Sequence, residues 1–176
     1  MPPTILPFAT GVVLPPRAYL DTNFIVHARD NASRKYNAAS NCLAELLRQG
    51  VQLNVSALMF DELWWAYLKK SFQLMTGTEL TPARYKAQPG IVQTHWPAVQ
   101  AVMGVIRGWG GLNELPTPVG MVALAEALMQ TNSLLPRDAF HLALALHHGI
   151  ESLVTADSDF DNVQIPVGTA LTLVKI

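Results

Sequence analysis

Cysteine and charged residues are scarce in this 176-residue chain. Cys42 is the single cysteine, so no internal disulfide can form, and a reducing cytoplasm is the expected location. Charged residues make up 14% of the chain, against a usual share of about 25%, and half of the residues are apolar. A chain this apolar is expected to expose hydrophobic surface, which predicts a homodimer or another protein partner that covers it.

Long hydrophobic runs and a strong charge of one sign are also missing. No apolar run approaches the roughly 20 residues that span a membrane, so we expect no membrane segment. Prolines interrupt residues 1–16, which lack a basic start, so we interpret them as an N-terminal extension rather than a signal peptide. The net charge of −1 is no signature of nucleic-acid binding, so a nucleic-acid substrate would need a local basic patch or bound cations.

Apolar segments of strand length alternate with segments of helical periodicity after residue 16. Strands are predicted at 17–20, 51–55, near Leu115, at 152–157 and at 170–175. Helices are predicted from about 38 to 50 and at 57–70, 95–108, 119–130 and 136–148, with turn-rich loops at 76–90 and 108–118. Strands separated by helices predict an α/β fold of three layers, with a mostly parallel sheet of four to five strands flanked by helices.

The stretch AYLDTNFIVH places Asp21 directly after an apolar strand. Such a carboxylate either caps a turn or helix or is a functional group at the end of a buried strand. The rest of the chain favours the second reading, because ligands bind outside the carboxyl ends of strands in open parallel sheets. Four further carboxylates are expected at this edge: Glu62, Asp138, Asp157 and Asp159.

Several carboxylates in one crevice repel one another and raise one another's pKa unless a cation joins them. Oxygen ligands without a set of cysteines and histidines favour Mg²⁺ or Mn²⁺ over zinc. Glu62 is preferred to Asp61 as a ligand, because the residues one turn away are Leu58, Trp65 and Ala66. His141 lies on an apolar helix face, which is more typical of a structural histidine than of a metal ligand.

The aromatic and basic residues have either a structural role or a role in binding nucleic acid. Trp64 and Trp65 are expected to pack in the core or an interface rather than to stack on bases. Among the basic residues, Arg137 is the preferred phosphate contact because it adjoins Asp138. Weaker candidates for the same role are Arg34, Lys35, Lys69 and Lys70.

Four segments resemble, in order and context, the acidic motifs of PIN-domain nucleases, and most of all those of VapC-type toxins: YLDTN, SALMFDEL, LPRDAFHLALA and LVTADSDF. The resemblance implies a PIN-like nuclease domain over residues 17–176 that cleaves RNA phosphodiester bonds with Mg²⁺ or Mn²⁺. It also implies an RNA substrate and a small antitoxin as partners. Residues 1–16 and a long segment at 71–118 depart from the compact members of the family.

The resemblance also implies a role for each acid of the four motifs. Asp21, Glu62, Asp138 and Asp157 would hold the metal, and these four with Asp159 would form the catalytic set. The positions implied for substrate binding are Asn23 and Thr155, with Arg137 added from its place beside Asp138.

The acids after the strand at 152–157 can be ranked. Asp157 is expected to point with Thr155 toward the crevice, and Asp159 to lie in a turn whose Phe160 folds back onto the core. Asp161 is expected to be a solvated loop carboxylate. Substitution by Asn should therefore reduce activity most at Asp157 and least at Asp161.

Two other functions stay open on the sequence. One is a metal-dependent phosphohydrolase of another doubly wound fold, although LDTN lacks the second Asp that such enzymes commonly place two residues on. The other is a PIN-like RNA-binding or scaffold module without activity, although a complete set of acids argues against it.

Overall fold

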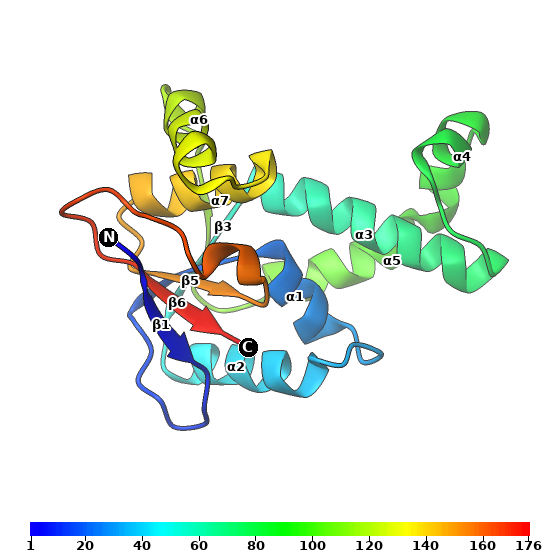
Figure 1. The fold of residues 1–176 in the computed structure, drawn as a ribbon. Coiled ribbons are helices and arrows are strands. Elements are labelled where there is room, and N and C mark those ends of the chain that lie inside the picture. The colour runs from blue at the N-terminus through cyan, green and yellow to red at the C-terminus, as the bar shows by residue number, and fades with distance from the viewer. The chain divides into compact units, whose positions relative to one another are not determined.

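The computed structural model describes residues 1–176, and its central feature is one six-stranded sheet (Figure 1). All neighbouring strands are parallel, in the order β1-β6-β5-β2-β3-β4. The strands are β1 (Thr4–Pro7), β2 (Arg17–Leu20), β3 (Gln52–Ser56), β4 (Leu112–Leu115), β5 (Ser152–Thr155) and β6 (Thr172–Lys175). The predicted α/β class and all five predicted strands are confirmed, and the sheet has one strand more than expected.

The additional strand, β1, comes from the N-terminal extension. It lies at the edge of the sheet, where Thr4 N donates to Leu171 O at 2.9 Å and Phe8 N donates to Lys175 O at 2.8 Å. Pro7 is compatible with this place, because an edge strand tolerates a residue that cannot donate to the ladder. Its missing N–H also makes the edge a poorer template for pairing with another chain.

Helices flank the sheet in two pairs. The pair α1 (Thr22–Arg29) and α2 (Tyr36–Arg48) lies on one side, and the pair α6 (Met121–Asn132) and α7 (Pro136–His147) lies on the other (Figure 1). Strands β2 and β5 are almost wholly buried between these layers, which agrees with the apolar residues at 18–20 and 153–154. A short 3₁₀ helix, η1 (Ser158–Phe160), follows β5.

The chain divides into two compact units. Residues 1–59 and 110–176 form the unit that contains the sheet, and residues 60–109 form the second unit. Helix α3 (Ala57–Thr76) starts in the first unit and continues into the second, which also contains α4 (Pro82–Ala87) and α5 (Ile91–Arg107). The predicted loop at 76–90 therefore holds a short helix.

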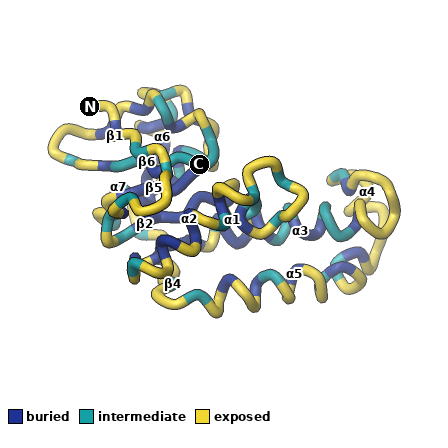
Figure 2. Tube along the Cα trace, turned by 90° about the horizontal axis from the view of Figure 1, so that it is seen from below, coloured by how far each residue is buried: buried dark blue, intermediate teal, exposed yellow.

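In the second unit, α5 presents a buried stripe whose members recur every three or four residues (Figure 2): Ile91, His95, Val99, Met103 and Ile106. This stripe is the pattern of an amphipathic helix. His95 Nδ1 lies 2.9 Å from Ser71 Oγ of α3, and the rings of Trp64 and Trp96 meet edge to face. These contacts hold α3 against α5. None of the helices, α3 and α5 included, combines the length and the apolar composition that a membrane span requires.

Candidate active site

The order of the sheet reverses between β2 and β5, which are neighbours in space but distant in the chain. Leu20 pairs with Val154, and Asp21 N donates to Val154 O at 3.1 Å just beyond the strand end. Asp157 follows β5 by two residues. Open parallel sheets bind ligands outside the carboxyl ends of the strands at such a reversal, so these two acids stand where a site is expected.

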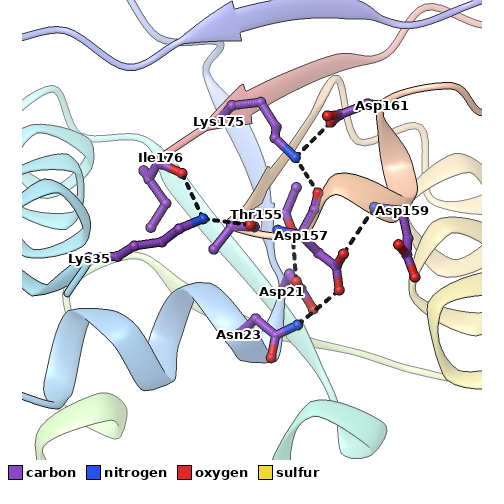
Figure 3. A network of polar contacts seen from close by, with 10 residues as sticks. Asp21, Asn23, Lys35, Thr155, Asp157, Asp159, Asp161, Lys175 and Ile176 are labelled. Atoms are coloured by element: carbon purple, nitrogen blue, oxygen red, sulfur yellow. Dashed lines mark hydrogen bonds and ion pairs between the residues drawn. The ribbon is translucent and has the colours of Figure 1, made fainter. Parts of the chain in front are cut away.

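Asp21 is buried, with 3% of its surface exposed, and Thr155 holds its side chain. Thr155 Oγ1 donates to Asp21 Oδ2 at 2.7 Å and accepts from Asp157 N at 2.9 Å, so one buried hydroxyl connects both acids (Figure 3). Asp21 occupies the N-cap position of α1, but its side chain makes no capping hydrogen bond. The structure therefore favours the interpretation of Asp21 as a functional carboxylate at the end of a buried strand over its interpretation as a helix cap.

Asp157 has further contacts that fix its carboxylate. Asn23 Nδ2 donates to Asp157 Oδ2 at 3.2 Å, and Asp159 N donates to Asp157 Oδ1 at 2.9 Å, which caps η1 (Figure 3). Phe160 is fully buried and anchors the end of the turn, while Asp159 is exposed. The turn thus carries Asp157 and Asp159 together. The carboxylate of Asp157 is oriented by the side-chain amide of Asn23 and by the backbone amide of Asp159.

Asp138 in the first turn of α7 belongs to the same group of acids. Its pKa is raised to about 6, first by burial, then by the charges of Asp157 and Asp21, and also by Asp159, while His141 acts in the opposite direction. Three of the other predicted acids therefore lie close enough to Asp138 for their charges to disfavour its ionised form. A divalent cation would relieve this repulsion.

A buried polar chain links β2, α7 and the end of β3, and it was not predicted from the sequence. Tyr19 Oη lies 2.7 Å from His141 Nδ1 and 2.7 Å from Ser56 Oγ, and all three residues are buried. Ser56 Oγ accepts from Met59 N at 3.4 Å, in the first turn of α3. One signal pointed to such a chain: a tyrosine inside an apolar strand needs a partner for its hydroxyl.

Glu62 lies on α3 in the second unit, and its side chain is half-buried, whereas Asp61 is exposed. The choice of Glu62 over Asp61, and the place of Glu62 among the other acids, stay predictions. Arg137 is exposed at the second residue of α7, directly before Asp138. Trp64 and Trp65 pack within the second unit, Trp65 against the edge of the Tyr85 ring.

Two lysines approach the turn after β5 (Figure 3). Lys35 Nζ donates to Ala156 O at 2.8 Å and Ile176 O at 3.3 Å, so it is engaged by backbone rather than free for a phosphate. Lys175 Nζ donates to Asp157 O and forms an ion pair with Asp161 Oδ1 at 2.7 Å. The expectation that Asp161 is a solvated loop carboxylate was therefore wrong, because β6 brings a cation to it.

The donors at this edge are carboxylate oxygens, with a hydroxyl and an amide beside them, which is the chemistry that Mg²⁺ and Mn²⁺ prefer. The one cysteine, Cys42, is buried, and burial raises the pKa of its thiol to about 12, so it offers no thiolate. No three acidic, histidine or cysteine side chains of the structure are grouped for metal binding. The fit to a hard divalent cation therefore rests on the donor types and on the negative charges that act on Asp138, and not on a ready-made group of ligands.

The family model of the PIN domain matches residues 18–166 of the chain. No match was found among curated protein sequences.

Solved structures of similar fold include toxin–antitoxin proteins. A VapBC complex of Rickettsia felis bound to promoter DNA matches with a TM-score of 0.54 and 14% identity, over 89% of this chain and 98% of that chain. A VapC toxin of Mycobacterium tuberculosis that cleaves the sarcin–ricin loop matches with a TM-score of 0.52 and 15% identity, over 81% and 92%. A toxin–antitoxin complex of Klebsiella pneumoniae matches with a TM-score of 0.51 and 18% identity, over 82% and 91%. At these identities the likeness concerns the fold.

Proposed function

This chain belongs to the PIN domain family, and we propose that it is a metal-dependent ribonuclease and the toxin of a toxin–antitoxin pair. The observation that carries the proposal is that one hydroxyl, of Thr155, connects Asp21 and Asp157 at the reversal of the sheet, while the charges of both acids act on Asp138. The similarity in fold to toxins and toxin–antitoxin complexes supports the toxin role.

We assign the metal to Asp21, Asp138 and Asp157 of the first unit, with Glu62 of α3 as the fourth predicted ligand. Bound Mg²⁺ or Mn²⁺ would lower the pKa of a water and neutralise charge that builds up on the phosphate. Asp159 is the exposed acid of the group and is our candidate for accepting the proton of that water. Arg137, exposed at the start of α7, is our candidate for holding a phosphate of the RNA.

Asn23 and Thr155 receive different roles. Asn23 is exposed and already bonds to Asp157, so it can both orient that carboxylate and reach a substrate. Thr155 is fully buried, with its hydroxyl bonded to Asp21 and to Asp157 N. We therefore assign Thr155 to positioning the two acids rather than to substrate binding.

The direct test measures cleavage of a labelled RNA by the purified protein, freed of any co-purified partner. Cleavage should require Mg²⁺ or Mn²⁺ and stop when EDTA is added. Asp21→Asn keeps the shape of the side chain and should abolish cleavage, while the exposed Glu151→Gln serves as a charge-matched control. Cleavage by Asp21→Asn at the wild-type rate would overturn the proposal.

The same preparation separates the two rival functions. Hydrolysis of p-nitrophenyl phosphate without cleavage of RNA would indicate a phosphohydrolase. Binding of RNA with no cleavage in either metal would indicate a binding or scaffold module. The proposed ribonuclease should cleave RNA and leave the small ester intact.

We also propose a homodimer and a small antitoxin as partners. Apolar side chains of the first unit are exposed around α6 and before α7: Val119, Val122 and Leu135. Exposed apolar groups of this kind are covered when a second chain binds. Light scattering should show more than one chain per particle, and a monomer at every concentration would contradict the dimer.

A further inference from the structure

Lys175 is the last residue of β6, and its ammonium group holds both ends of the turn that carries Asp157 and Asp159. Its Nζ donates to the carbonyl of Asp157 at the start of the turn and pairs with the carboxylate of Asp161 at the end (Figure 3). The side chain is 16% exposed, so it lies against the protein rather than in solvent. One cation therefore connects β6 to the whole acid-bearing turn.

The backbone of Lys175 is held on both sides. On one side it pairs in register with Thr155 of β5, the residue that bonds to Asp21. On the other side it pairs with Pro7 of β1, and Phe8 N donates to Lys175 O at 2.8 Å. Without β1, strand β6 would be an edge strand with a row of unpaired backbone groups.

The first residues of the chain strengthen this arrangement. Ile165 N donates to Met1 O at 2.9 Å, and Thr4 N donates to Leu171 O at 2.9 Å. These bonds tie β1 to the segment that leads into β6. The N-terminal extension thus lies one hydrogen bond away from the residue that holds the acid-bearing turn.

We propose that Lys175, held in place by strand β1, is a positioning residue that fixes the turn of Asp157 and Asp159 for metal binding and RNA cleavage. The proposal rests on the proposed function and gives the N-terminal extension a part in the active site. The other restraints on the turn lie within it or on the side of β5: the buried ring of Phe160, the bonds of Asp157 to Asn23, Thr155 and Asp159 N, the bond of Asp161 N to Ser158 O, and Lys35 at the preceding carbonyl. Lys175 is the side chain that joins the two ends of the turn to β6, and its loss removes this connection while leaving the acids chemically unchanged.

The first experiment compares Lys175→Met, Lys175→Arg and the control Lys86→Met, which removes an exposed lysine of α4. The readouts are Mn²⁺ affinity, measured by titration, and kcat and KM on one RNA. Lys175→Met should lower kcat or Mn²⁺ affinity by about 10-fold or more, the usual effect of losing a group that orients metal ligands. KM for RNA should stay unchanged, and Lys175→Arg, which retains the charge and the donors, should restore most of the loss.

A second experiment tests the part played by β1. Phe8→Pro removes the N–H that bonds to Lys175, whereas Phe8→Ala removes the same ring and keeps the N–H. Phe8→Pro should therefore lower kcat and Mn²⁺ affinity in the same direction as Lys175→Met, and Phe8→Ala should leave both near the wild-type values. Because both changes act through one residue, Phe8→Pro combined with Lys175→Met should be no worse than Lys175→Met alone.

Several results would overturn the inference. Lys175→Met with wild-type kcat and Mn²⁺ affinity would do so, and a rise in KM alone would make Lys175 an RNA contact instead. If Lys175→Met unfolds, Asp161→Asn breaks only the ion pair and should give part of the same loss. A wild-type protein that binds Mn²⁺ but cleaves no RNA would overturn the proposed function, and the Mn²⁺ affinities would then decide the role of Lys175.

Discussion

Thr155 and Asp21 lie 134 residues apart in the chain and meet at 2.7 Å, with the threonine hydroxyl donating to a buried carboxylate. Thr155→Val keeps the shape of the side chain and removes this donor. A hydrogen bond to a charged group contributes about 1.5–3 kcal/mol, so the free energy of unfolding should fall by about that amount. RNA cleavage should fall as well, because Asp157 N loses the same partner.

Denaturant unfolding and cleavage rates check this prediction together. Thr155→Ser retains the hydroxyl and should recover most of the stability and activity. If the valine variant unfolds at the wild-type denaturant concentration, the hydroxyl does not support Asp21 as the geometry indicates.

Tyr19 is the centre of the buried polar chain between His141 and Ser56. Tyr19→Phe removes the hydroxyl that both partners share and adds no atoms. Loss of a partner by a buried polar group costs about 1–3 kcal/mol, so unfolding should be easier by about that amount. Tyr85→Phe, on the exposed surface of α4, is the matched control and should change stability by less than about 0.5 kcal/mol.

Asp138 should make the metal-free protein less stable as the pH rises. Its pKa is about 6 in the folded protein and 3.8 in the reference state, so folding favours the protonated form. The stability present below about pH 4 is lost as the pH rises through about 6, because the folded state then gives up a proton that it held more tightly. Since Asp138 is partly exposed, this loss is discounted to about 1 kcal/mol.

Thermal unfolding in EDTA, compared between wild type and Asp138→Asn, isolates this effect from the other titrating groups. The variant should be as stable as the wild type near about pH 4 and more stable above about pH 7. Equal curves across the range would contradict the raised pKa of Asp138, which has burial as its first cause and the charges of Asp157 and Asp21 as the next. Added Mg²⁺ should stabilise the wild type more than the variant, since a bound ligand stabilises only the form that holds it.

The sequence predicted five of the six strands because each follows a local pattern of apolar residues bounded by turns or helices. It predicted the meeting of Asp21 and Asp157 because the carboxyl ends of parallel strands share one edge. Strand β1 has no such signal: TILP is four residues long and pairs with a strand near the other end of the chain. Pairing with a strand so distant in the chain depends on the arrangement of the complete sheet, which a local sequence pattern does not record.

The same reason explains the missed contacts within the site. Lys175 reaches Asp161 only because β6 lies beside β5 in register, which no spacing in the sequence records. The sequence indicates that the hydroxyl of Tyr19 needs a hydrogen-bond partner. That its partners are Ser56 and His141 follows from the way α7 and β3 pack around β2. Local patterns identify the elements and their acids, and tertiary packing decides which neutral and basic residues support them.

The last prediction ranks the three acids that follow β5. Asp157 accepts hydrogen bonds from Asn23 and Asp159 N, so Asp157→Asn removes the oriented carboxylate and should reduce cleavage most. Asp159→Asn removes an exposed acid beside it and should reduce kcat with little effect on Mn²⁺ affinity, as expected of a proton acceptor. Asp161→Asn should produce a smaller but measurable loss, because it releases Lys175 from one end of the turn. Cleavage rates and Mn²⁺ titrations of the three variants give the order, and an Asp161→Asn variant with full activity would show that Asp161 is the simple loop carboxylate that the sequence alone indicates.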